Sequence, residues 1–286
     1  MRLRCRAPAT VANLGPGFDS LAMAIDLWNE VIIETEAPPA VEVRGEGAGE
    51  LPEDGSNLIF RSMTYLSREV GKPLPSFRLS SVNRIPLERG LGSSSAAVVS
   101  GLLIADRLLE ARLGEDGILQ MAADLEGHPD NAAAGLWGGV VVAYLSPDGW
   151  RAERLEPSDR VRPTLLLPLD ERIPTTDARR VLPREVPLAD AAFNAGRAAL
   201  MVRALTDRPE LLAVAMEDRL HQARRLPLAP SARAVFEDLR ARGVPVCVAG
   251  AGPSLVAFAD ELPELGPGWR VLRSGIASGG ASVSEA

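Results

Sequence analysis

The segment that most constrains the fold is PLERGLGSSSAA, residues 86–97. A strand-like stretch, FRLSSV, precedes it at 77–82, and an apolar run with helical spacing follows it from about residue 94 to residue 113. Gly90 and Gly92 permit positive φ and a close approach of the backbone to a ligand. The free N–H groups of a helix start favour an anion, although serines 93–95 could instead cap an ordinary helix. The chain must therefore turn sharply from a strand into a helix, with or without an anion at the turn.

The loop lacks the lysine that the commonest phosphate loop requires. Of the 31 basic residues, 30 are arginines and Lys72 is the single lysine, in a turn-rich stretch. GxxxxGK[ST] is absent, GxGxxG would need glycine where Ser95 stands, and GxSxG would need glycine at Ala96. Positive charge for a ligand must therefore come from arginine, from a backbone dipole or from a metal. The net charge of −7 argues against general nucleic-acid binding.

The length of 286 residues favours two domains, which we place at 1–155 and 156–286, because a polar segment at 146–160 separates two structured halves. We expect strands at 1–7, 29–36, 41–45, 77–82, 140–145, 164–169 and 269–277, two more around a glycine turn at 244–260, and a hairpin within 146–160. We expect helices at 56–71 with Ser56 as the cap, and at 94–113, 115–127, 188–206, 209–221 and 230–242. Residues 277–286 are expected to be a frayed tail. The order of elements in the second half resembles a split βαβ sandwich.

No stretch approaches 18 uninterrupted apolar residues, and no apolar region follows the basic residues of the N-terminus. We therefore expect no membrane partner and a cytoplasmic location. Cys5 and Cys247 lie in apolar runs and are expected to be buried thiols in a reducing compartment.

Several segments resemble, in the right order, the motifs of the GHMP kinase superfamily. PxxxGLGSSxA at 86–96 resembles its phosphate loop, and AGAGPSLVAF at 249–258 resembles its third motif. PATVANLGPGFDSLAMAID at 8–26, EGHPDNAAAGLWGG at 126–139 and IPTTDARRVLP at 173–183 resemble the branch that phosphorylates homoserine. The resemblance covers nearly the whole chain. It implies a two-domain α+β fold, with a ribosomal protein S5 domain 2-like N-terminal domain and a ferredoxin-like C-terminal domain.

The same resemblance implies ATP, Mg²⁺ and L-homoserine as the small molecules that bind, a role in threonine biosynthesis, and a homodimer. The ATP-binding residues it implies are Asn57, Pro86, Leu87, Glu88, Arg89, Gly90, Leu91, Gly92, Ser93, Ser94, Ser95 and Ala96. The resemblance also implies that Ser94 and Glu126 hold the metal, and both offer the hard oxygen ligands that Mg²⁺ takes. The residues implied for catalysis are Asn131, Glu126, Ser94 and Thr175.

Homoserine offers an ammonium, a carboxylate and a reacting hydroxyl to its binding site. A guanidinium fork binds a carboxylate with two parallel hydrogen bonds, and the resemblance assigns Arg179 and Arg224 to this role. The match around Arg224 is loose, so Arg225 remains an alternative. The resemblance further implies that Asp19 pairs with the ammonium.

Asn13 and Asn131 would bind other polar groups of the substrate, as the resemblance implies. The turn sequence NLGPGFD, at 13–19, is also consistent with ordinary turn chemistry.

A general base is the open question of the mechanism. An alcohol is far less acidic than any side chain, and many relatives carry an aspartate where this chain has Asn131. Asp130 is adjacent, but our hypothesis is transfer without a dedicated base, with the proton leaving through the phosphate or water. We expect His128 to shape the HPDN turn and His221 to lie on a helix surface.

Two other functions remain open. One is a GHMP-type kinase for another small alcohol, which the absence of a lysine near the first motif disfavours. The other is a catalytically silent paralogue that binds a nucleotide or an amino acid, which the intact Gly90, Gly92, Ser94 and Glu126 disfavour.

Overall fold

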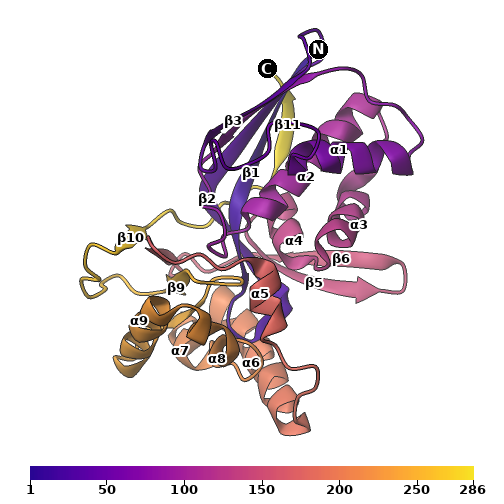
Figure 1. Ribbon diagram of the computed structural model, residues 1–286. Coiled ribbons are helices and arrows are strands. Elements are labelled where there is room, and N and C mark those ends of the chain that lie inside the picture. The colour runs from indigo at the N-terminus through magenta and orange to yellow at the C-terminus, as the bar shows by residue number, and fades with distance from the viewer.

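Two β-sheets organise the chain, which the computed structural model describes over residues 1–286 (Figure 1). The strands are β1 (Arg2–Asn13), β2 (Gly17–Glu34), β3 (Ala40–Gly45), β4 (Arg78–Asn83), β5 (Val140–Ser146), β6 (Gly149–Leu155), β7 (Thr164–Pro168), β8 (Val246–Val248), β9 (Leu255–Ala257), β10 (Trp269–Leu272) and β11 (Ser282–Glu285). The α-helices are α1 (Leu58–Glu69), α2 (Ser93–Leu109), α3 (Gly114–Glu126), α4 (Asp130–Trp137), α5 (Thr175–Arg180), α6 (Leu188–Thr206), α7 (Leu212–Ala215), α8 (Gln222–Arg225) and α9 (Pro230–Ala241). Short 3₁₀ turns are η1 (Pro209–Leu211) and η2 (Leu226–Leu228). This mixed α+β arrangement is the fold class that the sequence predicts.

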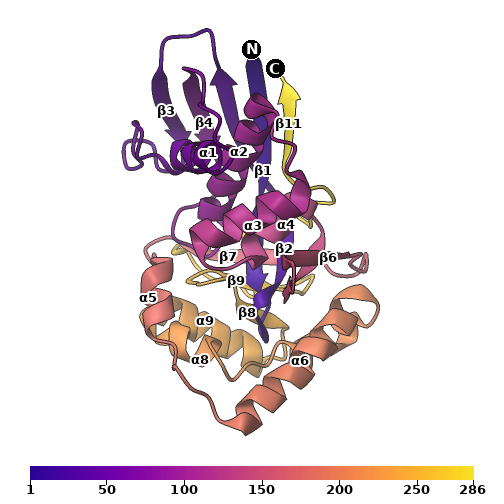
Figure 2. The same ribbon diagram turned by 90° about the vertical axis from the view of Figure 1, so that its right-hand side faces the viewer.

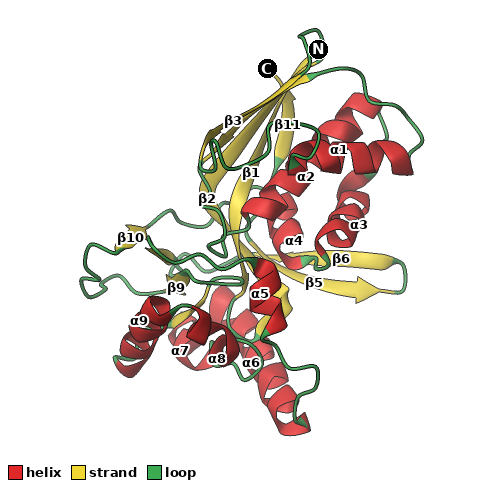
Figure 3. Cartoon of the chain, in the orientation of Figure 1, coloured by secondary structure: helices red, strands yellow, loops and turns green.

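The first sheet has seven strands and is built around β1 and β2. The 18-residue β2 pairs with β5 over residues 21–23 and with β4 over residues 30–34. Register shifts along β1 bend this pair, as bulges do, so that one long strand serves two neighbours. Helices α1 to α4 lie together against one face of the sheet (Figure 3). In β1 the exposed arginines alternate with buried Leu3 and Cys5, as the period-two pattern predicts.

The second sheet is antiparallel, in the order β10-β7-β9-β8, and lies in the half of the molecule that contains α5 to α9 (Figure 2). A core cluster joins the two halves, since Val11 and Met23 of the first sheet share it with Leu165 and Val256 of the second. Cys5 and Cys247 are free and buried, as predicted, and burial raises the pKa of Cys5 to about 12. None of the helices combines the length and the apolar character needed to cross a membrane.

The prediction of a frayed C-terminal tail is wrong. β11 pairs antiparallel with β1, with Leu3 opposite Glu285 and Arg6 opposite Ser282, so the two termini lie side by side (Figures 1 and 2). The edge of β1 would otherwise expose unpaired backbone groups, and a polar strand is enough to satisfy them. The division at residue 155 stays a prediction, and the last strand lies in the first sheet.

The predictions for three helices also need correction. Asn57, not Ser56, caps α1, because its Oδ1 accepts from Ile59 N at 3.0 Å. Gly92, at φ 68°, is the N-cap residue of α2, and no side chain caps this helix. The hydroxyls of serines 93–95 are therefore not used for capping. Helix α2 ends at Leu109, before Glu110 adopts a positive φ of 47°. The predicted helix at 209–221 is broken into η1, α7 and a turn.

Candidate active site

A cavity of about 640 Å³ collects residues from both halves of the chain. Its wall includes parts of the first motif, the phosphate loop, the HPDN segment, α5 and the third motif. The predicted site residues that line it are Asn13, Asp19, Asn57, Pro86, Leu87, Glu88, Arg89, Gly90, Leu91, Gly92, Ser93, Ser94, Ser95, Glu126, Asn131, Thr175 and Arg179. Their chemical roles stay predictions, but the fold brings segments far apart in sequence to one place.

The two glycines of the phosphate loop allow close backbone packing. A Cβ on Gly90 would lie 2.0 Å from the carbonyl oxygen of Ala249 in the third motif, and one on Gly92 would lie 1.9 Å from Thr10 Oγ1. The loop thus packs against the first and third motifs at once. The N–H groups of residues 93–95 have no acceptor within the protein, so the start of α2 can donate them to an anion in the cavity.

The carboxylate of Glu126 lies beside the start of α2. Ser95 Oγ donates to Glu126 Oε2 at 2.5 Å, and Ser94 also contacts this carboxylate. Burial raises the pKa of Glu126, and the two serine hydroxyls oppose that shift. A half-buried carboxylate next to a serine hydroxyl offers the hard oxygen donors that Mg²⁺ prefers, so these residues fit the metal that the sequence predicts. Ser95, whose role the sequence leaves open, is engaged with Glu126 rather than with the helix backbone.

Asn131, the last residue of the HPDN segment, is held by a hydrogen bond from Thr10 in β1. Thr10 Oγ1 donates to Asn131 Oδ1 at 2.7 Å, which turns the amide so that its Nδ2 has only a long contact, 3.5 Å, to Asp130. Asp130 is buried and its Oδ1 accepts from Asn131 N at 2.8 Å, while His128 Nδ1 lies 2.9 Å from the same oxygen. His128 therefore stabilises the turn, as predicted, and Asp130 acts as a local acceptor at the start of α4.

An ion pair occupies the other end of the cavity. Arg179 contacts Asp19 with both terminal nitrogens, at 2.9 and 3.2 Å, and each side chain is about one-third exposed. Asn13 accepts from Asp19 N at 3.1 Å and donates to the Gly250 carbonyl at 2.9 Å. Asn13 and Asp19 both have positive φ, 70° and 54°, a backbone state that persists only where the surroundings fix it.

Arg225, not Arg224, lines the cavity. Its guanidinium is buried and donates to the Gly250 carbonyl at 2.9 Å, whereas Arg224 is exposed on the other side of α8. Successive helical residues are rotated by about 100°, so only one of two neighbouring arginines can face inward. Burial and the nearby Arg179 guanidinium lower the pKa of Arg225 to about 10.

Other predicted site residues differ from expectation. Ala96 does not line the cavity and is 2% exposed, because it faces the core one turn into α2. Arg89 lines the cavity, but its guanidinium donates to the carbonyls of Pro168 and Leu169, which ties the phosphate loop to the end of β7. Asn57 is buried and uses both ends of its amide on backbone groups, including the Pro52 carbonyl at 2.8 Å. His221 is 1% exposed, so the prediction of a surface position is wrong.

Sequence reasoning missed two residues that support the site. Thr10 fixes Asn131, and the ring of Phe18 lies 5.4 Å from the guanidinium carbon of Arg225 and 5.9 Å from that of Arg179. An aromatic residue beside a predicted ligand such as Asp19 was the signal for Phe18, since arginines commonly stack on aromatic rings.

This fold, with an anion-ready loop entering a helix, defines the class of protein. Residues 57–139 match the family described as the GHMP kinases N terminal domain. The curated homoserine kinase of Streptomyces avermitilis is 42% identical over 98% of this chain and 95% of its own length, and that of Streptomyces coelicolor is 43% identical over 98% and 94%. The chain therefore belongs to the homoserine kinase family. The crystal structure of homoserine kinase from Cytophaga hutchinsonii matches with a TM-score of 0.83 at 26% identity, over 99% of this chain and 97% of that one.

Proposed function

We propose that this protein transfers the γ-phosphoryl group of ATP to the side-chain hydroxyl of L-homoserine, which yields O-phospho-L-homoserine for threonine biosynthesis. The names of the relatives at 42–43% identity support this assignment. The observation that carries it is the ion pair between Asp19 and Arg179, with Arg225 beside it, in the same cavity as the free N–H groups of α2. An anion site and a site for paired opposite charges are what ATP and an amino acid require.

The ion pair between Asp19 and Arg179 matches the zwitterion of an α-amino acid. The substrate ammonium pairs with Asp19, and its carboxylate takes the fork of Arg179, with Arg225 as a second cation. When the substrate binds, Asp19 and Arg179 each exchange the other for a substrate group of opposite charge. Neither side chain is then left without an ionic partner in the cavity. Asn13 completes the site for the ammonium, as it already orders the Asp19 backbone.

Phosphoryl transfer requires positioning and charge stabilisation more than covalent chemistry. The N–H groups at the start of α2 bind the ATP phosphates. Asn131 and Thr175 line the cavity, and we assign them to the substrate hydroxyl. Ser94 and Glu126 are the residues that hold Mg²⁺, which when bound neutralises phosphate charge. Asp130 is committed to hydrogen bonds within its own turn, so the hydroxyl proton leaves through the phosphate or water.

The proposal extends to a cytoplasmic homodimer with a domain division near residue 155, for which the family resemblance is the support. Light scattering on the purified protein tests the assembly, since a dimer has twice the 30.4 kDa mass of one chain. A mass of one chain at micromolar concentration would contradict it.

A coupled assay of ADP release over a panel of alcohols with Mg-ATP tests the activity. The panel contains L-homoserine, L-serine, mevalonate and galactose, and the same reactions with excess EDTA serve as controls. We expect turnover with L-homoserine that EDTA abolishes. Turnover only on another alcohol would replace the substrate, and ATP binding without turnover on any alcohol would indicate a silent paralogue.

A further inference from the structure

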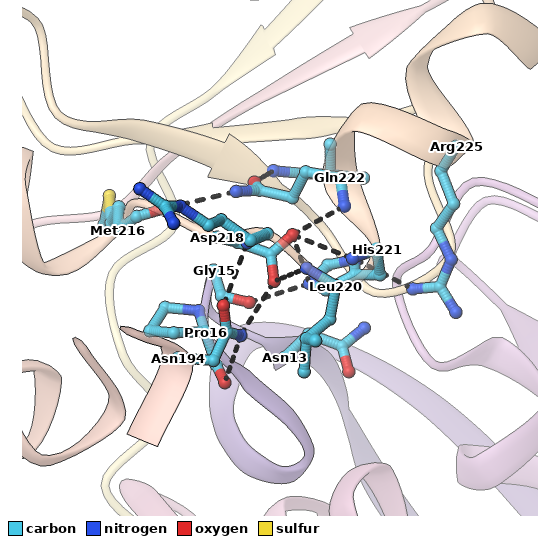
Figure 4. Close-up of polar contacts among 12 residues, drawn as sticks. Asn13, Gly15, Pro16, Asn194, Met216, Asp218, Leu220, His221, Gln222 and Arg225 are labelled. Carbon is cyan, nitrogen blue, oxygen red and sulfur yellow. Dashed lines mark hydrogen bonds and ion pairs between the residues drawn. The ribbon is translucent and has the colours of Figure 1, made fainter. Parts of the chain in front are cut away.

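A buried cluster of polar side chains lies behind the wall that carries Arg225 (Figure 4). Its centre is Asp218, whose side chain is fully buried. Asp218 Oδ2 accepts from the backbone N–H groups of His221 and Gln222 at 2.9 and 2.7 Å, and Oδ1 accepts from Asn194 Nδ2 at 2.9 Å. The carboxylate thereby holds the first turn of α8 in place, which puts His221 and Arg225, four residues apart, on the same inward face.

Each nitrogen of the His221 imidazole has one hydrogen-bond partner, and Nε2 also lies 3.9 Å from Asp218 Oδ2. Nε2 lies 2.7 Å from the carbonyl oxygen of Gly15, and Nδ1 lies 3.3 Å from a terminal nitrogen of Arg225. A carbonyl only accepts and a guanidinium only donates, so His221 is neutral, with its proton on Nε2. Burial lowers the pKa of His221, in agreement with a neutral ring. The ring of Phe18 covers it at 5.5 Å between centroids.

The two contacts connect His221 to the two parts of the proposed amino-acid site, one for the substrate ammonium and one for its carboxylate. Gly15 belongs to the turn between β1 and β2, which joins Asn13 at the end of β1 to Asp19 near the start of β2, the two groups for the ammonium. Arg225 is the second cation for the carboxylate. The two parts are also joined directly, because the Gly250 carbonyl accepts hydrogen bonds from both Asn13 Nδ2 and Arg225, each at 2.9 Å.

We infer that His221 is a positioning residue for the amino-acid substrate, which sets the spacing between Arg225 and the turn that carries Asn13 and Asp19. The inference rests on the proposed function, because the zwitterion defines what must be spaced. His221 does not line the cavity and touches neither substrate, so it acts through Arg225 and Gly15. His221 and Asp218 have no hydrogen bond to the phosphate loop, which meets this cluster only where Gly250 packs against Gly90. We therefore expect a much smaller effect on ATP binding than on L-homoserine binding.

Two substitutions separate the two contacts of the ring. His221→Gln places an amide N–H near the Nε2 position and can keep the Gly15 contact, but it offers no acceptor to Arg225. His221→Asn places an oxygen near the Nδ1 position and can keep the Arg225 contact, but it does not reach Gly15. We expect each to raise KM for L-homoserine about tenfold or more, the cost of one charge-assisted or buried hydrogen bond, with KM for ATP changed by less than about twofold.

Gln222→Met is the matched control for loss of a buried hydrogen bond in the same cluster. The Gln222 side chain bonds Val248 N and the Met216 carbonyl, at 2.8 and 3.1 Å, and has no hydrogen bond to Arg225 or to Gly15. We expect its melting temperature to fall while KM for L-homoserine stays within about twofold. If Gln222→Met raises that KM as much as the His221 variants do, or if the His221 variants raise both KM values equally, the role is structural and the inference is wrong.

A measurement on the unaltered protein covers the case in which the variants do not fold. The chain has two histidines, so long-range ¹H–¹⁵N spectra can resolve both rings. We expect the His221 signals to show the Nε2–H tautomer and its Nδ1 resonance to move when L-homoserine binds, but not with a nonhydrolysable ATP analogue. The other tautomer, or no shift with L-homoserine, overturns the inference. An unaltered enzyme that does not turn over L-homoserine would instead refute the proposed function.

Discussion

The two ends of the cavity use different kinds of chemical group: backbone N–H groups at one end and side chains at the other. The phosphate end uses backbone N–H groups at the start of α2, and glycines at 90 and 92 let three motifs pack together there. The substrate end uses side chains, with Asp19 paired to Arg179 across 160 residues and His221 bonded to Gly15 across 206. A backbone site depends on conformation and tolerates many side chains. A site made of side chains depends on the identity of each side chain and on the residues that hold it in position.

The largest expected effect is from Gly90→Ala, which attacks the phosphate end through the backbone. The new Cβ would lie 2.0 Å from the Ala249 carbonyl, so the loop must shift, and a displacement of about 1 Å can cost about 10²-fold in rate. Because several N–H donors move together, we expect kcat/KM to fall about 10³-fold.

Gly71→Ala is the control, since Gly71 has nearly the same φ, 67° against 70°, and no atoms near its Cβ position. It is expected to lower stability by about 1 kcal/mol through backbone strain alone, with kcat/KM unchanged. If the two variants behave alike in steady-state kinetics and in urea unfolding, close packing of the loop is not what the glycine provides.

Arg225→Met tests the substrate end of the cavity, again by steady-state kinetics and with a control variant. Removing a guanidinium that binds a carboxylate in a buried site costs several kcal/mol, so we expect KM for L-homoserine to rise about 10²-fold with KM for ATP nearly constant. Arg224→Met changes the neighbouring exposed arginine and is expected to leave both constants within about twofold. A larger effect from the Arg224 substitution would return the role to the residue first predicted.

The contrast between the two ends also explains what the sequence could predict. The phosphate loop is a local arrangement of glycines and serines, and most long helices and strands follow from period and turn residues. The sequence did not reveal that β11 completes the first sheet. A four-residue strand with one apolar residue, Val283, is too short to carry a clear pattern, and it pairs only where β1 leaves an edge.

At the substrate end the missing information is three-dimensional. Nothing in the local sequence distinguishes Arg224 from Arg225, since the choice depends on how Asp218 sets the rotation of α8. Likewise, His221 lies in a polar, arginine-rich segment typical of a surface, and it is buried because the turn at Gly15 packs against it. Such positions are decided by contacts between segments, which periodicity and local motifs do not report.

Asp130→Asn asks whether any carboxylate between the two ends acts as a base. Asparagine can replace Asp130 as the acceptor for Asn131 N, so the turn is expected to persist. A general base contributes about 10²- to 10⁴-fold, and without that role we expect kcat to fall by less than about tenfold at saturating Mg-ATP and L-homoserine. A fall near 10⁴-fold with an unchanged melting temperature would make Asp130 the base.

The smallest expected effect is on stability against pH, and it concerns the substrate end. Burial is the main cause that lowers the pKa of His221, and Arg225 adds to it, while Asp218, the Gly15 carbonyl and Asp19 oppose it. The unfolded chain binds a proton on this ring near pH 6.5 and the folded chain does so only at lower pH. The stability that the neutral ring contributes is therefore complete above about pH 6.5 and is lost as the pH falls towards the folded pKa.

Urea unfolding between pH 7.5 and 5.5 measures this dependence. We expect the unaltered protein to lose about 1 kcal/mol more over that range than His221→Gln does, because the variant has no proton to take up at this position. Comparing slopes rather than absolute stabilities removes the cost of the substitution itself. Since His128 is present in both proteins, its titration cancels, and parallel slopes would mean that the buried ring accepts a proton without disturbing Arg225 or Gly15. A shallower slope in the variant would show that the substrate end depends on a neutral imidazole, a dependence that a loop built from backbone amides does not share.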